Sequence, residues 1–128
     1  MKNDSSVNKK HILVVVDEPL VSQSIEMLLE DDGYIVDQAK DGFEALAMFQ
    51  VGKFDMVFTD YCMPEMRGDK LAEAIKRLVP NQPIVMITAF PEKLQTSACP
   101  LGGIDSFLCK PFDLDMLRTA ITRYAPWP

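Results

Sequence analysis

The sequence has little of what several large classes of protein require. Among its 128 residues there is one histidine, and its three cysteines do not fall at the paired spacings of a structural zinc site. Cys62, Cys99 and Cys109 are an odd number, and no apolar core of a secretory signal follows Met1, so we expect reduced thiols in a cytoplasmic protein. No apolar run approaches the roughly 20 residues that span a membrane.

Positive charge is also scarce. The chain has 13 Lys and Arg residues against 19 Asp and Glu residues, which gives a formal net charge of -6. This balance argues against nonspecific binding to nucleic acid or to an anionic membrane surface, so neither is expected as a direct partner. The basic cluster Lys9-Lys10-His11 is interpreted as a solvated lead-in to the first strand.

The length and composition fit a single soluble domain. A chain of 128 residues with 48% hydrophobic residues can bury a core without a disulfide or a structural metal. We expect residues 1–9 to form a disordered N-terminal tail, residues 10–125 to form the domain, and residues 126–128 to form a short C-terminal tail.

Apolar runs alternate with amphipathic stretches five times along the domain. The runs are Ile12–Val16, Tyr34–Gln38, Asp55–Thr59, Pro83–Thr88 and Ser106–Cys109. Four of them are nearly continuous in apolar residues, as expected for parallel strands covered on both faces, whereas Tyr34–Gln38 is more polar and suits a sheet edge. The stretches between them carry apolar residues at helical spacing. The pattern therefore predicts an α/β fold with a parallel sheet and right-handed crossovers.

Local signals mark several helix boundaries. Asp41 with Glu44 predicts a capping box at the start of the second helix. Gly33 and Gly52 follow helical stretches, where a left-handed closing residue is expected. Between the fourth and fifth strands, the stretch Pro91–Cys99 predicts a short, weak helix, because a second proline follows it directly.

Polar and charged residues stand at the ends of four predicted strands; they are Asp17, Asp60, Thr88 and Lys110. The carboxyl ends of parallel strands meet at one end of a sheet, where open α/β sheets bind ligands. Phosphoryl transfer to a carboxylate needs an acceptor, an oxygen-bound divalent cation, and donors for the equatorial oxygens. Asp60 fits the acceptor and Asp17 fits a metal ligand. Thr88 and Lys110 fit the hydroxyl and the cationic donor.

In these motifs the sequence resembles the receiver domain of two-component response regulators. The matching segments lie in order and at matching spacings within residues 10–125; they are Val15–Pro19, Thr59–Gly68, Ile87–Ala89 and Phe107–Phe112. The resemblance implies a flavodoxin-like, doubly wound five-stranded parallel sheet in the order 2-1-3-4-5, with five flanking helices. Asp17 and Asp60 would then flank the switch point between the first and third strands.

The resemblance also implies a role for each site residue. Asp60 accepts a phosphoryl group from a phosphohistidine on a sensor histidine kinase or phosphotransfer protein. Mg²⁺ is the implied cofactor, with Asp17, Asp60 and the backbone carbonyl of Cys62 as its ligands. Lys110 and Thr88 assist the transfer, and Thr88 with Phe107 couples phosphorylation to the partner-binding face.

The implied activity is that of a phosphoacceptor switch in a two-component phosphorelay. Such a protein is not an enzyme in the usual sense, because it catalyses only its own phosphorylation and dephosphorylation. The domain takes up nearly the whole length, so we expect a downstream protein target, or a longer regulator containing this chain, to carry the output. A haloacid-dehalogenase-like phosphatase is the competing enzyme class, but its second Asp is missing two residues beyond both Asp17 and Asp60.

One position departs from the family pattern. Receivers usually carry two adjacent acids after the first strand, and Val16 stands at the first of these. Affinity for hard cations follows ligand charge, so we expect weaker Mg²⁺ binding. Glu18 is expected to point outward and to compensate only in part. The alternative interpretation is a pseudo-receiver, a protein-binding module that works without phosphorylation.

Overall fold

A five-stranded parallel sheet forms the centre of the computed structural model, which describes residues 10–63, 65–88 and 106–124. The strands are β1 His11–Val15, β2 Ile35–Ala39, β3 Met56–Asp60, β4 Ile84–Thr88 and β5 Ser106–Cys109. They lie in the order β2-β1-β3-β4-β5, so the predicted α/β class and strand order are confirmed. The carboxyl ends of β1 and β3 lie side by side at the switch point of this doubly wound sheet.

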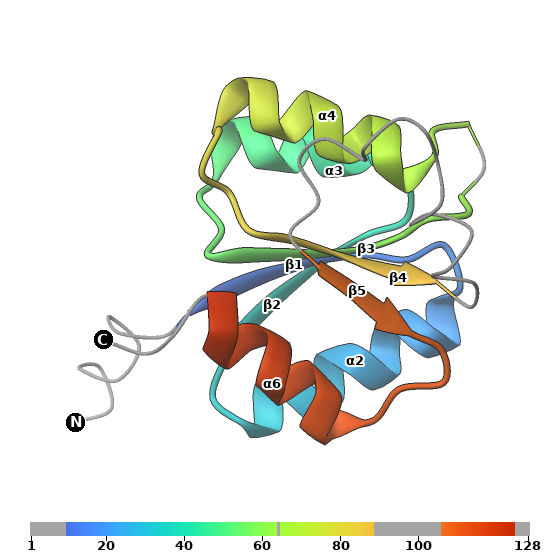
Figure 1. Cartoon of the computed structure of the whole chain (residues 1–128), viewed down its shortest axis with the longest axis vertical. Coiled ribbons are helices and arrows are strands. Elements are labelled where there is room, and N and C mark those ends of the chain that lie inside the picture. Colours follow the sequence, from blue (N-terminus) through green and yellow to red (C-terminus); the bar gives the residue numbers. More distant parts are fainter. Residues whose placement is uncertain (1–9, 64, 89–105, 125–128) are drawn as a thin grey trace.

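Four helices within the described residues cover the sheet. They are α2 Pro19–Asp31, α3 Gly42–Val51, α4 Gly68–Leu78 and α6 Leu114–Tyr124. Figure 1 shows α3 and α4 on one face of the sheet and α2 and α6 on the other. The fifth predicted helix, Pro91–Cys99, lies outside the described residues, as do the predicted tails at 1–9 and 126–128. None of the helices in the described part of the chain is long and apolar enough to cross a membrane.

The sheet separates two apolar cores, because successive side chains of a strand point to opposite faces. On β1, Ile12 and Val14 pack in the core beneath α2 and α6, whereas Leu13 and Val15 pack in the core beneath α3 and α4. All four side chains are fully buried. Burying a side chain of this kind contributes roughly 1.5–3 kcal/mol, so the two cores hold the strand ends in fixed positions.

The predicted helix boundaries are mostly confirmed. The Asp41 side chain accepts the Glu44 N–H at 2.8 Å, and Oε1 of Glu44 accepts the backbone N–H of Lys40 at 2.8 Å. Gly33 follows α2 with a φ of 95°, the left-handed conformation expected there. The prediction for Gly52 is wrong, because the chain leaves α3 directly into extended backbone with φ -136° and needs no left-handed residue.

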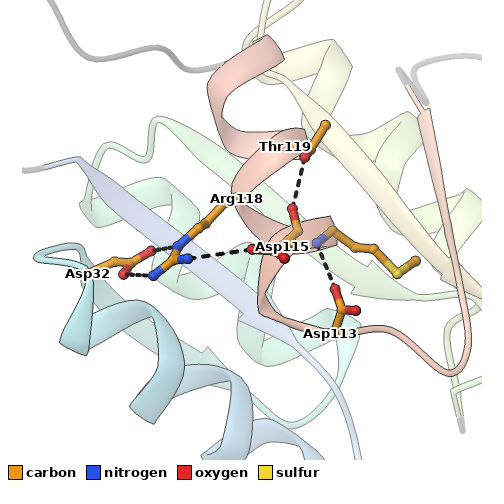
Figure 2. Close-up of polar contacts among 6 residues, drawn as sticks. Asp32, Asp113, Asp115, Arg118 and Thr119 are labelled. Carbon is orange, nitrogen blue, oxygen red and sulfur yellow. Dashed lines mark hydrogen bonds and ion pairs between the residues drawn. The ribbon is translucent and has the colours of Figure 1, made fainter.

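An exposed ion pair ties α6 to the C-terminal end of α2 (Figure 2). The Nε and Nη2 atoms of Arg118 donate to the two carboxylate oxygens of Asp32 at 2.6 and 2.7 Å. The Arg118 hydrogen bond lowers the pKa of Asp32, and the same pair raises the pKa of Arg118. Asp113 caps α6 by accepting the N–H of Met116 at 3.0 Å. The two-point geometry fixes the orientation of α6, although exposed pairs contribute little to stability.

Candidate functional site

Asp60 lies at the carboxyl end of the central strand β3, with only 3% of its surface exposed. The apolar pattern predicted Asp60 directly after the strand, whereas it is the last residue of β3 and pairs with Ile87 of β4. The difference arises because the ladder continues past Thr59, and the Tyr61 N–H also donates to the Ile87 carbonyl at 3.1 Å. The ladder therefore fixes the position of the Asp60 carboxylate.

Lys110 is the partner of the Asp60 carboxylate. Its Nζ lies 3.0 Å from Oδ1 of Asp60, and 34% of the lysine side chain is exposed. The backbone N–H of Lys110 donates to the Thr88 carbonyl at 2.9 Å, which extends the contact between β4 and β5 beyond Cys109. The structure thus brings together two residues, distant in sequence, that the strand-end pattern assigned to one site.

Burial and nearby charges act on the Asp60 carboxyl in opposite directions. Burial raises the pKa of Asp60 above its ordinary value of 3.8, whereas the hydrogen bond and charge of Lys110 lower it. The negative charges of Asp17 and Glu18 raise this pKa further. Because the raising effects win, ionised Asp60 is less favourable here than at an exposed position. A carboxyl perturbed in this way, beside a lysine at the carboxyl end of a sheet, is typical of functional sites.

The junction between β1 and α2 brings acidic residues to the same end of the sheet. Asp17 is exposed and near enough for its charge to act on Asp60. Val16 is 3% exposed and packs in the core beneath α2 and α6, so it adds no polar group. Glu18 is exposed, as predicted, but its charge also acts on Asp60. A partial role for Glu18 at the site was predicted from the sequence, but spacing alone did not reveal that its charge acts on Asp60.

The loop after β3 packs closely against the acceptor strand. A Cβ atom on Gly68 would lie 2.3 Å from the backbone oxygen of Asp60 and 2.7 Å from Sδ of Met86. The Gly68 N–H donates to the Tyr61 carbonyl at 2.9 Å. Gly68 is therefore required by a close approach of α4 to β3, a role that its place in the matched motif did not reveal.

The three ligands predicted for a metal ion at Asp60 are all oxygen atoms, the kind that a hard divalent cation prefers. The predicted ligands are the carboxylates of Asp17 and Asp60 and the backbone carbonyl of Cys62. The Tyr61 carbonyl is engaged by Gly68, whereas no hydrogen bond to the Cys62 carbonyl occurs among the described residues. Within the described residues, no three His, Cys, Asp or Glu side chains form a metal-binding group. The predicted set has only two such side chains, and its third ligand is a backbone carbonyl. Such an all-oxygen set matches the preference of Mg²⁺.

Thr88 and Phe107 lie on the strands that lead from the site to the edge of the sheet. Thr88 is the buried last residue of β4 and pairs with Cys109. Phe107 is half-buried and lines a groove of about 360 Å³ between β5 and α6. Thr88 is therefore at the same end of the sheet as Asp60 and Lys110, and Phe107 lies on the outermost strand.

The known proteins that this chain is similar to include response regulators and sensor histidine kinases, among them RcsC of Escherichia coli, which is 34% identical over 114 residues covering 89% of this chain and 12% of RcsC. The family model described as the response regulator receiver domain matches residues 12–122. The transcriptional regulatory protein GlrR of Escherichia coli is 35% identical over 111 residues, which cover 87% of this chain and 25% of GlrR. The solved structure of chemotaxis response regulator CheY4 of Vibrio cholerae has a TM-score of 0.82 and 33% identity, covering 91% of this chain and 98% of that one. The response regulator TrrA of Thermotoga maritima, in complex with Mg²⁺-BeF, has a TM-score of 0.81 and 31% identity, covering 90% and 98%.

These similarities agree with the observed fold. The chain spans about a quarter of the length of GlrR but nearly all of the CheY4 and TrrA chains. The family match extends from β1 into α6 and so includes all five strands. The chain therefore belongs to the response regulator receiver domain family.

Proposed function

We propose that this chain is a phosphoacceptor switch of two-component signal transduction. Asp60 takes a phosphoryl group from the phosphohistidine of a sensor histidine kinase or phosphotransfer protein. An Asp60 oxygen forms a bond to phosphorus as the nitrogen–phosphorus bond of the donor breaks. Hydrolysis later restores the carboxylate and releases inorganic phosphate. The functional unit is the domain of residues 10–125 acting in the cytoplasm, and a downstream protein target reads its state.

Each residue at the carboxyl end of the sheet has its own task in this proposal. The Lys110 ammonium holds Oδ1 of Asp60, which orients the carboxylate and offers positive charge to the phosphoryl oxygens. Asp17, Asp60 and the Cys62 carbonyl would hold Mg²⁺, which would supply positive charge to offset that of the phosphoryl group. The Thr88 hydroxyl donates to the phosphoryl group, which adds a charge of about -1.5 to -2. Phosphorylation of Asp60 changes the conformation of Phe107 on the outer strand β5, and this alters the surface that binds partner proteins.

The contact between Lys110 and Asp60 is the observation that carries the proposal. A nearly buried carboxylate is held at the switch point of the sheet with an ammonium 3.0 Å away. Two further acids, Asp17 and Glu18, place like charge near it. Stability alone does not favour this arrangement, because like charges and burial both oppose ionisation. A site that binds a divalent cation and transfers a phosphoryl group to Asp60 would account for this arrangement of charges.

Acetyl phosphate with Mg²⁺ tests the proposal directly. Intact-protein mass spectrometry should show the gain of one phosphoryl group in the wild type, and the gain should require Mg²⁺. Asp60→Asn should abolish it, because the acceptor oxygen is lost. Asp55→Asn is the matched control, since Asp55 stands before β3 at the opposite end of the sheet and accepts the His11 N–H. Phosphorylation that persists in Asp60→Asn would place the acceptor elsewhere.

The burial of Val16 favours a second candidate, a pseudo-receiver that binds its partner without phosphorylation. With one acid fewer, the site attracts a divalent cation less strongly. In that case the wild type should take no phosphoryl group from acetyl phosphate or from phosphoramidate, even at high Mg²⁺ concentration. In the presence of acetyl phosphate and Mg²⁺, its partner should then bind wild type and Asp60→Asn equally, which the switch does not allow.

A further inference from the structure

Glu18 has no evident structural task in the described part of the chain. It is the residue that precedes α2 at the capping position, yet its side chain makes no capping hydrogen bond. Ser, Thr, Asp and Asn are the residues that usually cap a helix through their side chains. No hydrogen bond or ion pair of the Glu18 carboxylate occurs among the described residues, and the residue is exposed. Its charge is therefore available to the surroundings.

Glu18 also faces the same space as the lysine of the site. One groove of about 680 Å³ is lined by both Glu18 and Lys110, with further walls from α2 and from Pro111 and Phe112. The ammonium of Lys110 in turn contacts Asp60. The negative charge of Glu18, like that of Asp17, raises the pKa of Asp60. Apolar walls increase the reach of such a charge compared with open water.

The negative charge of Glu18 matters because Val16 stands where receivers usually carry an acid. Without a carboxylate at Val16, the formal charges of Asp17, Asp60 and Lys110 sum to -1. Glu18 brings the total to -2. The affinity of an oxygen site for a hard divalent cation rises with its negative charge.

We propose that Glu18 is a positioning residue for the divalent cation, supplying from outside the set of direct ligands the negative charge that Val16 lacks. The inference rests on the proposed function, because it concerns the cation site of the same reaction. The effect is electrostatic, so a shorter carboxylate at this position preserves it and added salt weakens it.

Calorimetric titration of the unphosphorylated protein with MgCl₂ tests this role. Glu18→Gln should weaken Mg²⁺ affinity about three- to tenfold, whereas Glu18→Asp should stay within about twofold of the wild type. Glu30→Gln removes an exposed acid at the other end of α2 and should leave the affinity unchanged, which controls for net charge. At about 1 M ionic strength the Debye length falls to about 3 Å, so the difference between Glu18→Gln and the wild type should shrink.

The outcomes separate this inference from the proposed function. If the wild type binds Mg²⁺ and Glu18→Gln binds it equally well, the role of Glu18 is refuted and the phosphoacceptor proposal is untouched. A loss that Glu18→Asp does not rescue, or that salt does not reduce, also refutes it in favour of a structural role. A wild type that binds no Mg²⁺ overturns both. Thermal unfolding of each variant without metal establishes that the fold is intact.

Discussion

The two ends of the sheet treat their acidic residues differently. At the end where the strands begin, Asp55 accepts the backbone N–H of His11 at 2.8 Å, and a carboxylate oxygen of Asp37, from the middle of β2, reaches to 2.8 Å from Nε2 of the same histidine. Both carboxylates are only partly buried and each has a partner. These acids connect β1 to its neighbours through His11, so their role is structural.

At the end where the strands finish, three acidic residues have one basic partner between them within the described residues. Asp60 is nearly buried and has Lys110, but Asp17 and Glu18 have no side-chain partner among the described residues. Their charges oppose the ionisation of Asp60. The comparison teaches that acids with partners maintain the fold, whereas acids collected around one lysine indicate binding of a cation or transfer of an anionic group. Four substitutions test this contrast.

The largest effect is expected from Gly68→Ala, because the added Cβ would lie 2.3 Å from the backbone oxygen of Asp60. Either α4 or the end of β3 must move, which should destabilise the protein by roughly 2–3 kcal/mol and lower its Tm by about 8 °C. Gly52→Ala is the control, since its nearest contact would be an ordinary 3.6 Å and its backbone is extended. Circular dichroism measures both, and equal Tm values would show that α4 does not constrain the acceptor strand.

Val16→Asp should change stability and cation binding in opposite directions. The carboxylate would enter a position that is 3% exposed, so without metal the free energy of unfolding should fall by about 2 kcal/mol. The extra charge should raise Mg²⁺ affinity about tenfold. Val16→Thr keeps the shape without the charge and should leave the affinity unchanged. Calorimetry that finds equal affinities for wild type and Val16→Asp would contradict the role given to the missing acid.

Asp60→Asn should stabilise the metal-free protein at neutral pH. Because burial raises the pKa of Asp60, folding favours the protonated form, and the stability that this group contributes is lost as the pH rises through its folded pKa. The amide is neutral at every pH, so its Tm at pH 7 should exceed that of the wild type by about 3 °C. The difference should disappear as the pH falls below 3.8. A variant that is less stable than the wild type at pH 7 would mean that the lysine outweighs burial.

Asp37→Asn should have the smallest effect and the opposite sign. It weakens the contact with His11 at the other end of the sheet, where both side chains are partly exposed. Such pairs typically contribute less than about 1 kcal/mol, so we expect a loss of about 0.5 kcal/mol. The same unfolding measurements serve here. Stabilisation by Asp37→Asn would remove the distinction between the two ends of the sheet.

The five parallel strands and the positions of Asp60 and Lys110 could be predicted because their signals are local, whereas the strand order followed from the resemblance to the receiver family. Buried parallel strands appear as short apolar runs, and a charged residue directly after such a run must lie at the carboxyl end of the sheet. The capping of α3 by Asp41 was predictable for the same reason, since its hydrogen bond spans three residues.

Other features depend on contacts between segments that no sequence spacing encodes. The need for glycine at position 68 comes from the backbone of β3, and the influence of Glu18 comes from how α2 lies beside the loop after β5. The turn at Gly52 was mispredicted because glycine is compatible with both extended and left-handed backbone, so its identity does not decide between them.

The backbone amide of Lys110 provides a natural reporter for the chemistry of its own side chain. Its N–H is protected by the Thr88 carbonyl at 2.9 Å, while its ammonium contacts Asp60 on a strand beyond β4. We expect a chemical change at Asp60 that moves the ammonium to change how often the hydrogen bond of that amide opens. Hydrogen–deuterium exchange at this single position should register such an event, even where the rest of the sheet keeps its protection.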